Sequence, residues 1–185
     1  MEEQTMKATG IVRRIDELGR VVIPKEIRRT QHIRQGTPLE IFTTGDGEVI
    51  FKKYSPVEEL EPLAQRYVQV LSRSLGVPCI ICDREQVIAA CGAGKKELEG
   101  KPISPRLEQT LEKRNLYTWS GGEEPPLAPC QGSSRQVGAA APILAAGELV
   151  GAVAALTQDP RQPCPPEQAK AVQVAAGFLA RQMEE

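Results

Sequence analysis

The sequence predicts an α+β protein of two domains joined by a helix. Residues 1–55 alternate short apolar strands with one short helix, residues 56–76 follow helical spacing, and residues 77–185 place strands between a first and a last helix. The composition changes over residues 55–62, where prolines and glutamates gather, and this change marks the domain boundary. A chain of 185 residues is long enough for two small domains.

A cluster of cations lies near the start of the chain. Residues 7–34 carry eight Lys and Arg side chains against three carboxylates, a local net charge of +5, whereas the whole chain carries −1. The eight cations are Lys7, Arg13, Arg14, Arg20, Lys25, Arg28, Arg29 and Arg34. Any one of them is simply explained as a solvated side chain. Their crowding on a near-neutral protein favours a surface that binds nucleic acid.

The first domain is predicted to contain four short strands and one helix. The strands are expected over residues 7–14, 20–23, 38–42 and 48–52, with turns at residues 16–19 and 44–47. Pro24 is expected at the first position of a helix that ends near Gln31, because the missing N–H costs nothing there. A domain of about 50 residues buries little surface and exposes its strand edges. The pattern therefore predicts that this domain needs a partner.

The second domain is predicted to hold an antiparallel sheet with helices on it. The strands are expected over residues 77–83, 86–92 and 116–120, followed by a strand pair within 136–157. Helices are expected over 104–115, with Ser104 as N-cap, and over 165–185. Residues 121–134 are too rich in Pro and Gly for regular structure. The first helix and the last helix would flank the sheet in an α/β sandwich.

The cysteines are predicted to be free thiols. Their number is odd, and no secretory signal pattern opens the chain. Cys79 and Cys82 match a C-x-x-C pattern, but residues three apart on a strand point to opposite faces and are poorly placed to share one zinc ion. No apolar run approaches the roughly 20 residues that span a bilayer. We therefore expect a cytoplasmic, nucleoid-associated protein without membrane contact, metal or cofactor.

Two stretches carry a family resemblance. The motif DELGRVVIPKEIRR and the run GTPLEIFTTGDGEVIFKKYSP resemble the DNA-binding domain of the AbrB family of transition-state regulators. The resemblance implies a swapped-hairpin β-barrel dimer that binds double-stranded DNA and regulates sporulation-type genes, as activator or repressor. It places DNA-contacting side chains at Arg13, Arg20, Arg28 and Arg29. Lys7 and Arg14 are lesser candidates, expected near phosphates.

Interleaved hairpins would bury a core shared by two copies. We expect this core to comprise Val22, Ile23, Leu39, Ile41, Val49 and Phe51. The sequence departs from the family at the end of the helix, where Gln31-His32-Ile33 replaces the usual Leu-Gly before an Ile. Glycine is the residue best suited to a left-handed helix cap. The only histidine, His32, is therefore expected to be a surface or cap residue.

The second domain resembles a GAF sensor domain. The resemblance rests on the order of the elements and on the run APILAAGELVGAVAAL. It leaves two interpretations open. Small residues at 138–141 would make room for a small-molecule ligand of unknown identity, or the space is filled and the domain serves self-association. A second self-contact would turn the N-terminal dimer into a tetramer.

Two other functions compete with the regulator. An antitoxin would bind its operator with the first domain and block a toxin with its tail, but such tails are short, acidic and disordered, whereas residues 77–183 are periodic and apolar. A thiol-dependent GAF-type enzyme would need Cys91 or Cys130 as a nucleophile, and no base lies near either in the sequence. The sequence therefore predicts a DNA-binding regulator and not an enzyme.

Overall fold

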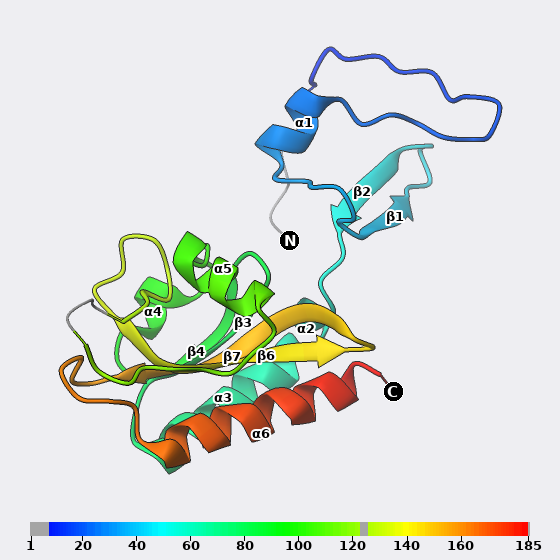
Figure 1. Ribbon diagram of the computed structural model, residues 1–185. Coiled ribbons are helices and arrows are strands. Elements are labelled where there is room, and N and C mark those ends of the chain that lie inside the picture. Colours follow the sequence, from blue (N-terminus) through cyan, green and yellow to red (C-terminus); the bar gives the residue numbers. More distant parts are fainter. Residues whose placement is uncertain (1–7, 123–125, 185) are drawn as a thin grey trace. The chain divides into compact units, whose positions relative to one another are not determined.

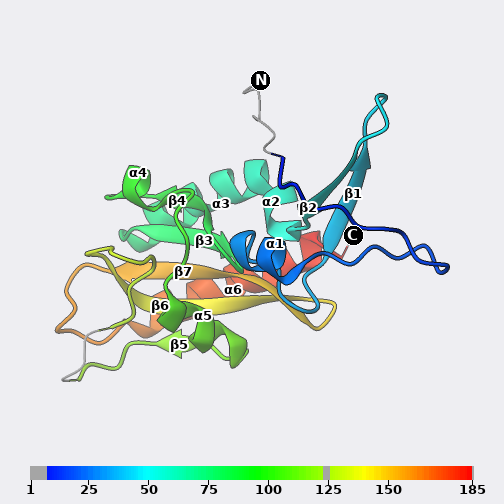
Figure 2. The same cartoon turned by 90° about the horizontal axis from the view of Figure 1, so that it is seen from above.

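The computed structural model describes residues 8–122 and 126–184, and Figures 1 and 2 show it in two orientations. The chain divides into two compact units, Met1–Tyr54 and Ser55–Glu185. Within the described residues, Pro24 is buried in the first unit, and every other buried aliphatic or aromatic side chain belongs to the second unit.

The first unit contains one short helix and one hairpin. Helix α1 spans Lys25–Thr30, and the antiparallel strands β1 (Leu39–Thr43) and β2 (Val49–Lys53) pair from Leu39↔Lys53 to Thr43↔Val49. Gly47 adopts a φ of +85°, and its N–H donates to the Thr44 carbonyl at 3.1 Å. The hairpin predicted from the Asp46-Gly47 turn is therefore confirmed.

Neither of the strands predicted at residues 7–14 and 20–23 forms within the described part of these segments, residues 8–14 and 20–23. Residues 8–24 contain no strand; they form an open loop that leads into α1 (Figure 1). A strand needs a neighbouring backbone to satisfy its N–H and C=O groups, and this segment finds none within a single chain. The prediction rested on the alternation of apolar residues. This alternation indicates which side chains share one face of a strand, but it does not indicate which backbone the strand pairs with.

Helix α1 ends in a left-handed cap. His32 adopts a φ of +53°, the Ile33 N–H donates to the Arg28 carbonyl at 2.7 Å, and the His32 N–H donates to the Arg29 carbonyl at 3.3 Å. This hydrogen-bond pattern is a Schellman motif, and His32 takes the place that glycine usually occupies. The expectation that His32 is a cap residue is confirmed. Pro24 precedes the helix as its N-cap, one position before the predicted N1.

The second unit is a five-stranded antiparallel sheet with helices on both faces. The strands lie in the order β4-β3-β7-β6-β5. They are β3 (Cys79–Asp83), β4 (Val87–Cys91), β5 (Tyr117–Thr118), β6 (Gln136–Ala145) and β7 (Glu148–Thr157). The helices are α2 (Pro56–Glu59), α3 (Glu61–Leu75), α4 (Lys95–Leu98), α5 (Pro105–Glu112) and α6 (Pro166–Gln182).

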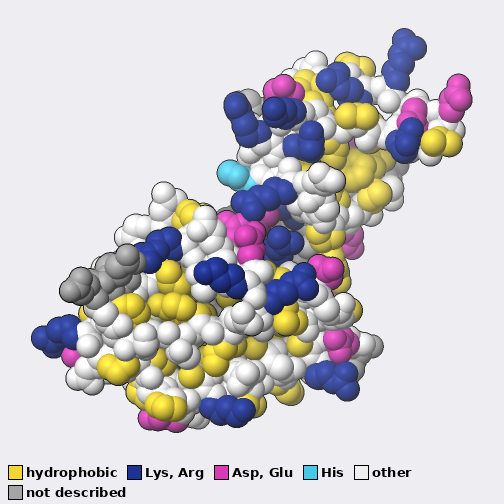
Figure 3. All heavy atoms as spheres, viewed as in Figure 1, with side chains coloured by type: hydrophobic (Ala, Val, Ile, Leu, Met, Phe, Trp, Pro, Cys, Tyr) yellow, Lys and Arg dark blue, Asp and Glu magenta, His cyan; other side chains and the backbone are white. Residues whose placement is uncertain are grey.

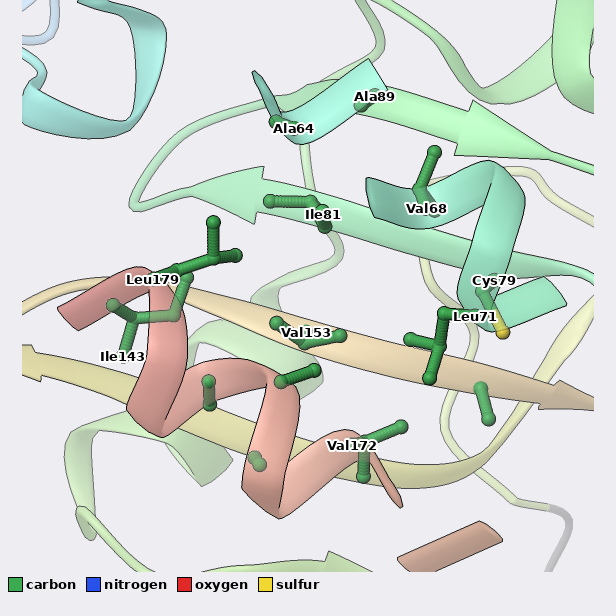
Figure 4. Close-up of a cluster of buried hydrophobic side chains, with 14 of the residues drawn as sticks. Ala64, Val68, Leu71, Cys79, Ile81, Ala89, Ile143, Val153, Val172 and Leu179 are labelled. Carbon is green, nitrogen blue, oxygen red and sulfur yellow. The ribbon is translucent and has the colours of Figure 1, made fainter. Parts of the chain in front are cut away.

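Helices α3 and α6 cover one face of this sheet, and α4 and α5 cover the other (Figure 1). Side chains alternate between the two apolar layers, so that Cys79 and Ile81 of β3 join the α3–α6 layer and Ile80 and Cys82 join the opposite one. Figure 4 shows side chains of the first layer, among them Val68 from α3, Ile81 from β3 and Leu179 from α6. The predicted divergence of Cys79 and Cys82 is confirmed.

Hydrogen bonds and apolar packing hold the segment through which the chain enters the second unit. Ser55 caps α2 by accepting from the Glu58 N–H at 3.3 Å, and its hydroxyl donates to the carboxylate of Asp83 at 3.1 Å. The buried Val57 packs over Gly151 of β7, where an added Cβ would meet the Val57 Cγ2 atom at 3.0 Å. The single helix predicted over 56–76 is therefore two helices, because α2 turns at Leu60 to seat Val57. The short helix α4 was not predicted.

Candidate nucleic-acid interface

A tight turn forms between Asp16 and Arg20 of the open loop. The Asp16 N–H donates to the Arg20 carbonyl, and the Gly19 N–H donates to the Asp16 carbonyl, both at 3.0 Å. Gly19 adopts a φ of +75°, which a residue with a Cβ adopts only with strain. The turn predicted at residues 16–19 is confirmed.

The Asp16 carboxylate holds this turn and the side chain that follows it. Its Oδ1 atom accepts from the N–H groups of Leu18 at 3.0 Å and Arg20 at 2.9 Å. Its Oδ2 atom accepts from the Arg20 Nε–H at 2.8 Å. The backbone and side-chain hydrogen bonds from Arg20 lower the pKa of Asp16 below its ordinary value. The sequence analysis placed Asp16 only in a turn; an Asp four residues before an Arg, across a Gly, was the signal for this ion pair.

The predicted DNA-contacting residues lie on three segments of the first unit. Arg13 and Arg14 lie in the extended part of the loop, where the Arg13 Nη1 atom donates to the Val12 carbonyl at 3.0 Å. Arg20 follows the tight turn, and Arg28 and Arg29 lie in the last turn of α1. All five side chains are exposed. Lys7 lies outside the described residues.

These arginines share their surface with apolar side chains. Among the described residues of the first unit, six large aliphatic side chains are more than half exposed, namely Val12, Ile15, Leu18, Val22, Ile41 and Val49. In Figure 3, Lys and Arg side chains surround a patch of hydrophobic ones over this unit. Of the expected core residues, Ile23 and Leu39 are half-buried, and Val22, Ile41, Val49 and Phe51 are exposed in the single chain.

The thiols of the second unit are poorly suited to nucleophilic chemistry. All five cysteines are free. Burial raises the pKa of Cys79 and of Cys82 to about 12, and it also raises the pKa of Cys130 and Cys164. Because the thiolate is the nucleophile, these four thiols are less reactive at neutral pH than free cysteine.

An open groove of the second unit lies close to residues 138–141, where the sequence analysis expected room beside the sheet. Ala139, Ala140 and Ala141 are buried by neighbouring side chains. A cavity beneath α5, lined by residues that include Ile103, Leu111 and Gly151, has a volume of about 10 Å³, the space of one water molecule. The groove has a volume of about 470 Å³ and lies beside β5 and the start of α6, against Trp119, whose N–H donates to the Gly138 carbonyl, and Cys164.

Within residues 8–122 and 126–184, no group of three or more His, Cys, Asp or Glu side chains is arranged to hold a metal ion. No helix in this part of the chain has the length and apolar character to cross a bilayer.

Comparison with protein families separates the two units. Residues 59–184 match a family described as the stage V sporulation protein T C-terminal, transcription factor. Residues 12–59 match a family described as antidote-toxin recognition MazE, bacterial antitoxin. The part of the chain that would hold an antitoxin's tail thus matches a transcription factor.

Individual relatives support the same division. The chain is 50% identical to stage V sporulation protein T of Bacillus subtilis (strain 168) over 180 residues, which covers 97% of this chain and all of the relative. It is 59% identical over 51 residues to the transition state regulatory protein AbrB of the same organism, covering 28% of this chain and 52% of the relative.

Solved structures resemble the second unit in fold. The GAF domain of a phosphoenolpyruvate-protein phosphotransferase from Coxiella burnetii aligns with a TM-score of 0.55 at 16% identity, over 67% of this chain and 82% of that one. The corresponding Acinetobacter domain aligns with a TM-score of 0.54 at 11% identity, over 71% and 84%. The chain therefore belongs to the stage V sporulation protein T family of transcription factors, with an AbrB-like DNA-binding domain followed by a GAF-like domain.

Proposed function

We propose that the first unit contacts double-stranded DNA through Arg13, Arg20, Arg28 and Arg29, with Lys7 and Arg14 against the phosphates. The observation that carries this proposal is the local charge of +5 over residues 7–34, whose described arginines are all exposed. A regulator acts where the DNA is, which places this chain in the cytoplasm at the nucleoid.

The chemistry of these side chains suits both phosphates and bases. An arginine fork binds phosphate oxygens and also pairs with the O6 and N7 atoms of guanine in the major groove. Helix α1 has only six residues, too few for a conventional recognition helix. We infer that the shape and flexibility of the DNA contribute much of the specificity.

The first unit acts as a dimer in this proposal. Its exposed aliphatic side chains and its unpaired segment 8–24 both gain from a second copy, which would supply apolar contacts and strand partners. A swapped-hairpin dimer is the arrangement that the AbrB likeness implies. Two copies would bring twice +5, or +10, to one DNA surface.

The second unit provides a separate self-contact. Helices α3 and α6 expose apolar side chains on the surface away from the sheet, among them Val70, Val174 and Phe178. The ring of Phe178 stacks on that of Tyr67 with centroids 5.1 Å apart, so the two helices present one continuous apolar face. Pairing of this face with a second copy would link two N-terminal dimers into a tetramer.

We favour self-association over ligand sensing for the second unit. Ala139, Ala140 and Ala141 are buried, and the cavity under α5 holds no more than one water. A small-molecule ligand would have to use the open groove beside Trp119. The only tryptophan of the chain lies there, so its fluorescence would report such binding.

A DNA titration tests the proposed contacts. A short duplex selected from a random pool by the wild-type protein is titrated by fluorescence anisotropy at several salt concentrations. Arg20→Ala and Arg28→Ala should each weaken binding at least tenfold, about 1.4 kcal/mol, with circular dichroism unchanged. Arg66→Ala, an exposed arginine of α3, should bind like the wild type. Wild-type binding by the alanine variants of Arg13, Arg20, Arg28 and Arg29 would contradict the proposal.

The salt dependence adds a second measurement. Each phosphate that is neutralised should contribute about 0.9 to the slope of log affinity against log salt. Removing a phosphate-contacting residue such as Arg14 should lower that slope, whereas removing a base-contacting residue should leave it nearly unchanged.

A further inference from the structure

Asp16 is the one carboxylate in the described first unit that is bonded to a proposed DNA-contacting arginine. It makes three hydrogen bonds, two to backbone N–H groups through Oδ1 and one to the Arg20 Nε–H through Oδ2. The Arg13 side chain instead bonds the neighbouring Val12 carbonyl. Arg28 and Arg29 have no carboxylate partner among the described residues. Arg20 is therefore held differently from the other three.

The bond at Nε determines which guanidinium edge is available. A guanidinium carries five N–H donors, one on Nε and two on each terminal nitrogen. Asp16 occupies the Nε donor at 2.8 Å, and the side chain of Arg20 remains 70% exposed. The side-on mode, which uses Nε together with one terminal nitrogen, is thus blocked. The end-on mode, which uses both terminal nitrogens, stays open.

We propose that Asp16 is a positioning residue that fixes Arg20 for end-on bidentate recognition of guanine, which makes Arg20 the base-reading arginine of the set. The terminal nitrogens of a planar fork match the O6 and N7 acceptors of guanine. The negative charge of Asp16 repels phosphates, so it steers Arg20 away from the DNA backbone and towards a base edge. This inference rests on the proposed contact between Arg20 and DNA.

The decisive variant is Asp16→Asn in the full-length protein. The Asn side-chain oxygen can still accept from the backbone N–H groups of Leu18 and Arg20, so the turn is kept, but the charged partner of the Arg20 Nε–H is lost. Asp16→Ala removes both the acceptor of these backbone N–H groups and the charged partner of the Arg20 Nε–H. Anisotropy titrations use the selected duplex and a scrambled duplex of the same composition, and circular dichroism checks the fold.

A positioning role predicts a loss of discrimination. Asp16→Asn should weaken binding to the selected duplex about tenfold and leave binding to the scrambled duplex unchanged or slightly tighter, because one repulsive charge is gone. Replacing single guanines by 7-deazaguanine, which lacks the N7 acceptor, should weaken the wild type at one position and have little further effect on Asp16→Asn. Tighter binding to both duplexes by the same factor would mean that Asp16 acts only as a charge, and equal weakening would mean that it acts only on structure. Either result, or wild-type discrimination, overturns the proposal.

A double-mutant cycle separates this proposal from the proposed function. In an Arg20→Ala background, Asp16→Asn should have no further effect on discrimination. If Arg20→Ala itself binds like the wild type, the proposed DNA contact is wrong. If Arg20→Ala loses affinity and Asp16→Asn does not, only the positioning role is wrong.

Discussion

In the second unit Ile80, Leu107 and Leu179 are completely buried, whereas in the first unit Val12, Leu18 and Val22 are 82%, 75% and 69% exposed. The backbones differ in the same way. Strands β6 and β7 pair along ten residues each, while residues 8–24 of the first unit make no strand pairing. A single chain therefore leaves the DNA-binding unit with exposed aliphatic side chains and with no strand pairing in residues 8–24. Completion of this unit by a second copy would tie DNA binding to dimerisation.

The largest expected effect is on the folding of the first unit alone. A fragment of residues 1–55 should form a folded dimer and unfold on dilution, because no folded monomer can bury the exposed aliphatic side chains. Sedimentation and circular dichroism across low micromolar concentrations measure this. A fragment of residues 55–185 serves as the control and should stay folded on dilution, since its two apolar layers are internal. A folded monomer of residues 1–55 would remove the contrast between the units.

A substitution inside the second unit should have the next largest effect. At Gly151 an added Cβ would collide with the Cys82 carbonyl and would lie 3.1 Å from the Asp83 Cα atom. Gly151→Ala should therefore lower the free energy of unfolding of this unit by about 3 kcal/mol. Gly138→Ala in β6 is the matched control, because a Cβ there meets no atom closer than 3.5 Å. Urea unfolding of the two variants measures the difference, and equal stabilities would show that β7 can shift away from β3 at Gly151.

The apolar face of α3 and α6 should control the higher oligomer and little else. Phe178→Glu places a charge beside Val174 and Tyr67, and it should weaken the association of dimers into the proposed tetramer by at least tenfold, about 1.4 kcal/mol. Leu116→Glu changes a side chain of similar exposure that precedes β5 and lines the groove beside Trp119, and it should leave the assembly intact. Analytical ultracentrifugation compares them. An unchanged mass for Phe178→Glu would place the second self-contact elsewhere.

The smallest effect is expected at the end of α1. His32 holds a φ of +53°, which costs a residue with a Cβ about 1 kcal/mol. His32→Gly should raise the stability of the first unit by somewhat less than that, because glycine also gains freedom in the unfolded chain. His32→Ala should bring no gain, since alanine keeps the Cβ. Thermal unfolding of both variants tests this, and a loss of stability in His32→Gly would mean that the imidazole makes a compensating contact.

Local chemistry was predictable from the sequence. Ser104 is expected as an N-cap, and its hydroxyl accepts from the Leu107 N–H at 3.2 Å. The turn before Arg20, the β1–β2 hairpin and the opposite faces of Cys79 and Cys82 also follow from residues that are close in sequence. The exposure of the arginines was also predictable from the sequence, because the short segment that carries them has no apolar layer in which they could be buried.

What the sequence determined by itself was the family, the identity of most elements and the cationic segment, since each depends on spacing, turn chemistry or charge within about a dozen residues. The tertiary structure decided that β3 pairs with β7, that Val57 occupies the space over Gly151 and that Asp16 holds the Nε of Arg20. It also decided that residues 8–24 stay unpaired. These outcomes depend on which backbone edge or side chain comes within reach once the chain has folded, and apolar alternation along a strand carries no information about its neighbour.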